Sequence, residues 1–206
     1  MSLFHSDKNL SFLDLITYPE ITIEKNVFTF ILGKSGCGKS SYLKLPNKTQ
    51  IPTRGKISFN DVDIADLPVL SYRRDVLLVP QDVFLFDKSI EENYKFYYDA
   101  RDQDIISKER MEEFLRLCCI DFPVDTDCTT LSGGEKQRVF LSIFISLAKN
   151  TILLDEPTAA LDAHTSAILL SQIKSYCKLN QLTAVCVCHN DALTQQFADK
   201  VIRFGE

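Results

Sequence analysis

Short runs of apolar residues alternate with longer segments of helical periodicity over the last third of the chain. The apolar runs predict strands, and segments whose apolar residues recur every three or four positions predict helices. In chain order, the predicted elements are a strand at 151–154, a helix at 163–178, a strand at 182–188, a helix at 191–198 and a strand at 200–204. This alternation predicts a parallel sheet with helices on its faces and ligands at the carboxyl ends of its strands.

Residues 1–80 show the same kinds of segment with more interruptions. A continuous apolar run at 27–32 predicts a buried strand, and 41–45 predicts a helix shortly after it. Further short strands are predicted at 12–16, 21–23, 56–59 and 76–79. The first part of the chain is therefore expected to consist mainly of strands.

After residue 80 the sequence pattern changes from one typical of strands to one typical of helices. Ser89 followed by Glu92 is typical of a capped helix start, and residues 108–119 carry apolar side chains at helical spacing. The longest apolar segment, 139–148, suits a buried core helix and is too short to cross a membrane. We expect one domain over 1–206, with a helical subdomain at 81–135 inserted into a core made of 1–80 and 136–206.

The amino-acid composition and net charge limit the classes of function that the chain can have. At 206 residues, 45% apolar and 25% charged, the chain has the balance of a globular domain with a sizeable core. Its net charge of −5 argues against a surface built to hold nucleic acid. The seven cysteines show no paired metal-binding spacing and the N-terminus shows no secretory pattern, so we expect a reducing cytoplasm.

The segment 33–40 fits the phosphate-binding pattern G-x-x-x-x-G-K-[ST], and we call it the phosphate loop. Its residues are Gly33, Lys34, Ser35, Gly36, Cys37, Gly38, Lys39 and Ser40. The glycines let backbone N–H groups converge on an anion, Lys39 adds a cation for the outer phosphates, and Ser40 offers a hydroxyl to Mg²⁺. A glycine-rich turn would rarely fit this pattern by accident between a buried strand and a helix. The loop therefore predicts a nucleotide site.

Two acidic residues end the predicted strand at 151–154. Asp155 is suited to hold Mg²⁺, because this ion usually takes one or two carboxylates and keeps several waters. Glu156 is placed to orient, or accept a proton from, the water that attacks a γ-phosphate. The plainer alternative is a strand that ends in a solvated acidic turn. Downstream of a phosphate loop, the pair favours a hydrolytic site.

A second anion-binding pattern lies at 131–138, with the letters LSGGEKQR. Ser132 can cap a helix that starts here, while Gly133 and Gly134 leave the first backbone N–H groups open to an anion. Since the chain already has one phosphate loop, this second helix end is surplus unless it faces a nucleotide bound elsewhere. The simplest arrangement places that nucleotide on a second copy of the protein.

With these motifs the chain resembles the nucleotide-binding subunit of ATP-binding cassette (ABC) transporters. The diagnostic pentapeptide stands unaltered at 131–135, between the phosphate loop, or Walker A, and the Walker B strand that ends in Asp155 and Glu156. Gln81 matches the Q-loop glutamine, Asp162 the D-loop aspartate and His189 the switch histidine. The resemblance implies an α/β fold of the P-loop NTPase (RecA-like) type, with a parallel-sheet core, a small antiparallel β part and an inserted α-helical subdomain.

The resemblance also implies a mechanism and its residues. Two copies form a head-to-tail homodimer with two ATP molecules between them, each held by one Walker A loop and the partner's signature. The implied ATP contacts within one chain are the phosphate loop, Ser41 and Asp162, and those made across the interface are Ser132, Gly133 and Gly134. Ser40, Gln81 and Asp155 are the implied Mg²⁺ residues, and Lys39, Gln81, Glu156 and His189 are the implied catalytic group. Without the resemblance, His189 would be read as a plain structural histidine.

Some positions depart from the family's pattern. The turn before the Walker A strand usually carries glycine, and 24–26 has none; Asn190 stands where aspartate is usual. The aromatic residue that stacks on adenine is expected to be Phe12, although Phe4 and His5 compete for that place and Phe12 fits an ordinary core position equally well.

The segment after Gln81 is where the family receives its membrane partner. Phe84 and Phe86 are candidates to line that groove, or else to pack the helical subdomain. We expect a separate ATPase subunit at the cytoplasmic face of a membrane, bound to an integral membrane permease. The compact chain loosely resembles the small ATPase subunits of bacterial two-component systems assigned to iron export. The alternatives are a soluble ABC ATPase acting on nucleic acid, ribosomes or protein assemblies and, less favoured, a small-molecule kinase.

Overall fold

The computed structural model describes residues 1–205, which contain a five-stranded parallel sheet in the order β11-β5-β10-β9-β8. Its strands are β5 (Phe28–Gly33), β8 (Val76–Val79), β9 (Thr151–Asp155), β10 (Thr183–Val187) and β11 (Lys200–Phe204). All neighbouring pairs are parallel. The predicted strands of the core are therefore confirmed, with shifts of one or two residues at some ends.

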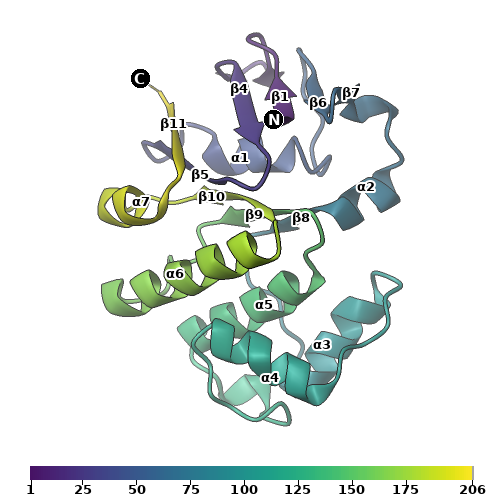
Figure 1. Ribbon diagram of the computed structural model, residues 1–206, viewed down its shortest axis with the longest axis vertical. Coiled ribbons are helices and arrows are strands. Elements are labelled where there is room, and N and C mark those ends of the chain that lie inside the picture. The colour runs from purple at the N-terminus through teal and green to yellow at the C-terminus, as the bar shows by residue number, and fades with distance from the viewer. Residues whose placement is uncertain (206) are drawn as a thin grey trace.

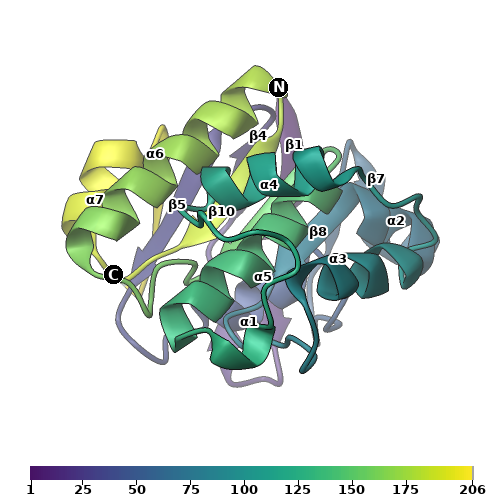
Figure 2. The same cartoon turned by 90° about the horizontal axis from the view of Figure 1, so that it is seen from below.

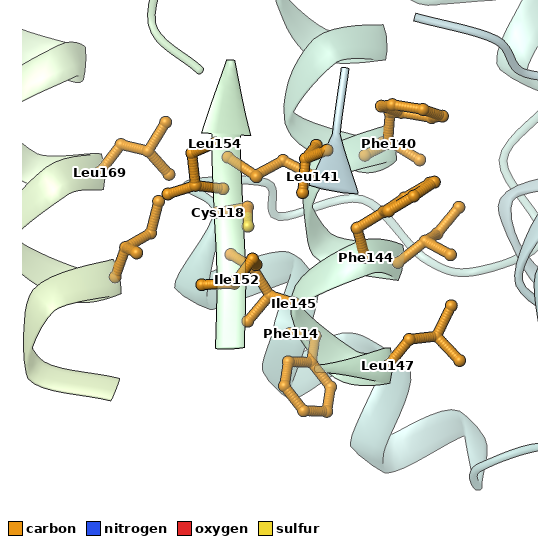
Figure 3. Close-up of a cluster of buried hydrophobic side chains, with 14 of the residues drawn as sticks. Phe114, Cys118, Phe140, Leu141, Phe144, Ile145, Leu147, Ile152, Leu154 and Leu169 are labelled. Carbon is orange, nitrogen blue, oxygen red and sulfur yellow. The ribbon is translucent and has the colours of Figure 1, made fainter. Parts of the chain in front are cut away.

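The sheet separates two hydrophobic cores because side chains alternate between its faces. On β9, Ile152 and Leu154 point into the core beneath the sheet as drawn in Figure 1, while Leu153 belongs to the core above it. Figure 3 shows Ile152 and Leu154 between the side chains of α5 and Leu169 of α6. A strand buried on both faces reads as a continuous apolar run, which is why these strands could be recognised in the sequence.

Seven α-helices complete the part of the chain that the structure describes. They are α1 (Lys39–Lys44), α2 (Val69–Asp75), α3 (Ile90–Asp99), α4 (Lys108–Leu117), α5 (Gly133–Leu147), α6 (Ala163–Leu179) and α7 (Asp191–Phe197), and short 3-10 helices at Ile64–Asp66 and Cys128–Thr130 precede α2 and α5. Figure 2 shows α3, α4, α5 and α6 on one side of the sheet. The proposed subdomain limits at 81 and 135 stay a prediction.

A four-stranded antiparallel sheet, β4-β1-β6-β7, lies above the parallel sheet in Figure 1. Its strands are β1 (Ser2–Ser6), β4 (Ile21–Glu24), β6 (Ile57–Phe59) and β7 (Val62–Asp63). The antiparallel part was expected, but β1 was not placed and α2 was not predicted. Asn26 has φ 60°, a backbone region that asparagine enters more readily than most residues, so it serves in the turn where the family usually has glycine.

The single strand predicted at 12–16 is wrong. The segment is a hairpin of β2 (Ser11–Phe12) and β3 (Ile16–Thr17), whose strands pair with each other. Leu13 and Asp14 both have φ 54°, which ends an extended strand, and the backbone N–H of Leu13 donates to Thr53 Oγ1 at 2.8 Å. The apolar residues that suggested one strand are therefore divided between a turn and two short strands.

Helix α5 connects the sheet to the helices beneath it. Its apolar residues from Val139 to Leu147 are buried around most of the helix, as expected for a core helix. It packs against α3 and α4, and Tyr94 Oη of α3 donates to Ser142 Oγ at 2.8 Å inside this contact. Among the described residues no helix has the length and apolar content needed to span a bilayer.

Candidate functional site

The phosphate loop joins β5 to α1 at the carboxyl end of the parallel sheet. Gly38 has φ 91°, and a Cβ atom at this position would lie 2.8 Å from Ile16 Cδ1 and 3.1 Å from Tyr18 Oη. Tyr18 Oη donates to the carbonyl oxygen of Gly38 at 3.2 Å. Both conformation and space therefore require glycine at position 38, and the β2–β3 hairpin region supports the loop from outside.

Lys39 is only 4% exposed and folds back into the loop. Its Nζ donates to the carbonyl oxygens of Gly33 and Lys34 at 2.8 and 3.0 Å, and Cys37 Sγ lies 4.0 Å away. An ammonium group has three N–H donors, and sulfur is a weak acceptor. Two strong hydrogen bonds thus hold the charge inside the loop, and the third N–H has only a poor partner.

Ser40 and Asp155, both predicted for Mg²⁺, are brought together from α1 and β9. Ser40 Oγ donates to Asp155 Oδ1 at 2.7 Å. Burial raises the pKa of the Asp155 carboxyl; the hydrogen bond from Ser40 opposes that shift, and Glu156 adds to it. A buried carboxylate and a hydroxyl are oxygen donors of the kind that Mg²⁺ prefers, so these residues fit the ion.

Glu156 and His189 also meet, across neighbouring strands. Glu156 Oε1 lies 2.7 Å from His189 Nε2, with their side chains 18% and 43% exposed. Glu156 has φ 51°, an uncommon conformation for a non-glycine residue, and its backbone N–H donates to the carbonyl oxygen of Val187 at 3.2 Å. Both residues line a hollow of about 160 Å³ outside the end of the sheet.

Gln81 follows β8, the neighbour of β9. Because Val79 pairs with Leu154, Gln81 and Asp155 both leave the same edge of the sheet, and Gln81 is exposed there. Asp82, which was not singled out in the sequence, is close enough for its charge to contribute to the raised pKa of Asp155. The loop after β8 therefore borders the carboxylate predicted to hold the metal.

The predicted anion-binding helix end is present at the start of α5. Ser132 Oγ accepts from the backbone N–H of Glu135 at 3.4 Å, and the Glu135 carboxylate accepts from the backbone N–H of Ser132 at 2.8 Å. This reciprocal capping box leaves Gly133 exposed, with no atom within 4 Å of the position of a Cβ. Nothing within the described part of this chain covers the start of α5 at Gly133.

The remaining residues predicted to contact ATP differ in their burial and in their hydrogen bonds. Asp162 caps α6, accepting from the backbone N–H and the hydroxyl of Thr165 at 2.9 and 2.6 Å, and these bonds lower its pKa. Phe12 is half-buried and pairs with Ile16, which contacts the phosphate loop, whereas Phe4 is only 1% exposed in the core. Ser41 is half-buried on α1. The ATP contacts of Phe12, Ser41 and Asp162 stay predictions.

One residue that bridges the site was missed. Gln137 Nε2 donates to the carbonyl oxygen of Glu156 at 3.2 Å, and Gln137 Oε1 accepts from the backbone N–H of Ala160 at 3.2 Å. A glutamine five residues after Ser132 gave no local signal of this role, because the two segments it joins lie about twenty residues away along the chain.

Comparison with known proteins decides the family. The sequence model of the family described as ABC transporter matches residues 17–159, which is most of the chain. The chain belongs to this family. The chain is thus an ABC nucleotide-binding domain, as the motifs predicted, and the roles of the individual motif residues stay predictions.

Two relatives that share this domain are much longer than the chain. The chain is 32% identical over 205 residues to the mitochondrial iron-sulfur clusters transporter ATM1 of Saccharomyces cerevisiae, covering 97% of this chain and 29% of that protein. It is 31% identical over 207 residues to the ABC multidrug transporter E of Aspergillus fumigatus, covering 93% of this chain and 16% of that protein. The chain therefore spans less than a third of the length of these two relatives.

The fold matches a solved cassette over almost the whole of both chains. A dimeric structure of the ATP-binding cassette MJ0796, in a post-hydrolysis state with ADP and Pi, superposes with a TM-score of 0.84 at 23% identity, covering 98% of this chain and 94% of that chain. The expected P-loop NTPase fold, with its parallel core, antiparallel part and helices, is confirmed.

Proposed function

We propose that this ABC domain is an ATPase motor that dimerises around two ATP molecules and drives a membrane partner. The observation that most strongly supports this proposal is that two pairs of interacting side chains lie at one edge of the sheet. Ser40 lies against Asp155, and Glu156 lies against His189, beside the loop that holds Lys39. The first pair suits a metal and the second suits a water molecule, which are the two requirements of phosphoryl transfer to water.

The chain's own groups have distinct tasks in this proposal. Backbone N–H groups of the phosphate loop bind the phosphates, and the third N–H of Lys39 exchanges its weak contact with Cys37 Sγ for a phosphate oxygen. Ser40, Asp155 and Gln81 would hold Mg²⁺, which would neutralise part of the phosphate charge when bound.

Glu156 orients the attacking water and accepts its proton, and His189 steadies the glutamate. With neutral imidazole, His189 Nε2–H donates to Glu156 Oε1 and keeps one carboxylate oxygen fixed. The other oxygen then points to the water. A general base placed in this way typically contributes about 10²–10⁴-fold to a rate.

The second ATP contact comes from another copy of the chain. The uncovered start of α5 combines exposed Gly133, helix N–H groups and the N-cap residue Ser132, which together form an anion site. This chain's phosphate loop needs no second anion site for its own nucleotide. The dimeric state of the similar cassette with ADP and Pi supports a composite site in which each signature faces the partner's ATP.

An exposed aromatic patch supports a membrane partner. The patch consists of Phe84, Phe86, Phe96 and Tyr97, with Phe84 59% and Phe96 47% exposed. Phe86 and Phe96 have ring centroids 4.1 Å apart, and Tyr97 Oη donates to the carbonyl oxygen of Phe84 at 2.7 Å. Such a preformed apolar surface suits a short helix of an integral membrane subunit, which would hold the domain at the cytoplasmic face. The likeness to iron-export subunits stays a prediction.

The test of the proposed activity is phosphate release from ATP by the purified chain. We expect Mg²⁺-dependent hydrolysis whose rate rises more steeply than linearly with protein concentration, because two chains build each site. Absence of hydrolysis in the presence of Mg²⁺ would contradict the proposal.

Co-purification separates the transporter from the soluble alternative. A tagged chain extracted in mild detergent should recover an integral membrane protein, and recovery of ribosomes, DNA or protein assemblies in its place would favour the soluble ABC ATPase.

A further inference from the structure

Gln137 is a buried polar side chain that the roles described above do not use. It lies in α5, one helical turn after the signature glycines, and is 7% exposed. A buried amide is expected to have its hydrogen-bonding groups satisfied, and the partners it uses show what it holds together.

Both ends of the amide bind backbone groups of the catalytic edge. Nε2 donates to the carbonyl oxygen of Glu156, and Oε1 accepts from the backbone N–H of Ala160, each at 3.2 Å. A Cβ at Gly134 would lie 3.1 Å from the carbonyl oxygen of Ala160, so the 160–162 loop also packs closely on the first turn of α5. The start of α5, the turn after β9 and this loop therefore form one connected unit.

The contact with Glu156 acts on a strained residue. With φ 51°, Glu156 needs its surroundings to hold it, because non-glycine residues rarely adopt this conformation. The carbonyl oxygen of Val187 fixes its N–H on one side, and Gln137 fixes its carbonyl oxygen on the other. The direction of the carboxylate toward His189 depends on both.

We infer that Gln137 is a positioning residue that couples the two ATP sites of the dimer. This inference rests on the proposed function, in which Ser132 to Gly134 contact the partner's ATP. The same helix that meets that ATP carries the amide that orients Glu156 beside the chain's own ATP. Engagement at one site is therefore transmitted to the catalytic glutamate of the other through the hydrogen bonds of this side chain.

Two substitutions separate the contacts of the amide. Gln137→Met keeps an unbranched side chain of similar length and removes both hydrogen bonds. Gln137→Glu retains an acceptor for the Ala160 N–H and removes the donor to the Glu156 carbonyl. Gln172→Glu, on a half-buried glutamine of α6, is the matched control for an added charge.

Steady-state ATP hydrolysis is measured against ATP concentration for each variant, together with the melting temperature. We expect both Gln137 variants to lose about 10-fold in kcat, to keep KM within about 2-fold, and to fall to a Hill coefficient of about 1. The control should match the wild-type chain in kcat, KM and Hill coefficient, whatever its melting temperature. A merely structural role would lower the melting temperature without this separation of kcat from KM.

Each other result has a defined meaning. Wild-type kcat and cooperativity in both Gln137 variants would overturn the inference and leave the proposed function standing. A reduced kcat with full cooperativity would overturn the coupling. A wild-type chain that hydrolyses ATP without cooperativity would overturn the composite site and the inference with it.

Discussion

At the scale of single residues, the site consists of two pairs of side chains, Ser40 with Asp155 and Glu156 with His189. Asp155 and Glu156 were recognised because two acids end a buried strand after a phosphate loop. Their partners Ser40 and His189 lie far away in sequence, at 2.7 Å in both cases. Family motifs named all four residues, but only the fold shows that the serine reaches the aspartate and the histidine reaches the glutamate.

The raised pKa of Asp155 indicates that the ionised carboxylate, which is proposed to bind Mg²⁺, lowers the stability of the fold. Since burial raises this pKa from 3.8, the protonated form contributes stability that is present below pH 3.8 and lost as the pH rises through the folded-state value. Asp155→Asn cannot ionise and still accepts from Ser40. We expect it to melt at a higher temperature than the wild-type chain at pH 7, because it removes the cost of burying an ionised carboxylate, and to lose Mg²⁺-dependent hydrolysis.

Thermal unfolding of both chains between pH 4 and pH 8 checks this prediction. The gap between their melting temperatures should widen as the pH rises. A variant less stable than the wild-type chain at pH 7 would show that the ionised carboxylate stabilises the fold.

At the scale of elements, the strands and long helices of the last third could be predicted because burial on both faces and helical spacing leave clear patterns. The 12–16 segment could not, because its turn is set by φ 54° at Leu13 and Asp14 and by a contact with distant Thr53. Helix α2 is seven residues long and mostly polar, so it left no periodic signal. Gln137 likewise acts through tertiary contacts alone.

Helix α5 allows a test of its N-terminus with an internal control. Ser132→Arg removes a capping serine and puts a long cation where the partner's ATP is proposed to bind. Ser89→Arg removes the equivalent serine of the capping box with Glu92 at the start of α3. Each should cost about 1 kcal/mol of stability. Only Ser132→Arg should abolish cooperative hydrolysis while ATP binding to the monomer is kept.

Nucleotide binding by a fluorescent ATP analogue and phosphate release distinguish the two variants. Loss of monomer binding in Ser132→Arg would show that the signature serves its own chain's nucleotide. Equal hydrolysis in both variants would show that the start of α5 does not meet ATP.

At the scale of the whole molecule, the aromatic patch belongs to the helical part of the chain that follows β8. The ring of Tyr97 packs on that of Phe140 of α5, with 5.8 Å between their centroids. Phe84→Ser with Phe96→Ser should therefore reduce recovery of a membrane partner about 10-fold or more, because apolar anchors dominate such contacts. Leu179→Ser, at a residue 84% exposed at the end of α6, is the control. Equal recovery with both would remove the patch from the docking surface.

The central claim is that one chain holds half of each ATP site. The most direct measurement is the mass in solution, by light scattering, of Glu156→Gln with and without ATP and Mg²⁺. A neutral amide cannot act as a base, so ATP should persist and convert the 23.4 kDa chain to a particle of twice that mass. The double variant that carries both Glu156→Gln and Ser132→Arg should remain a monomer under the same conditions. A Glu156→Gln chain that binds ATP and remains monomeric would contradict the account.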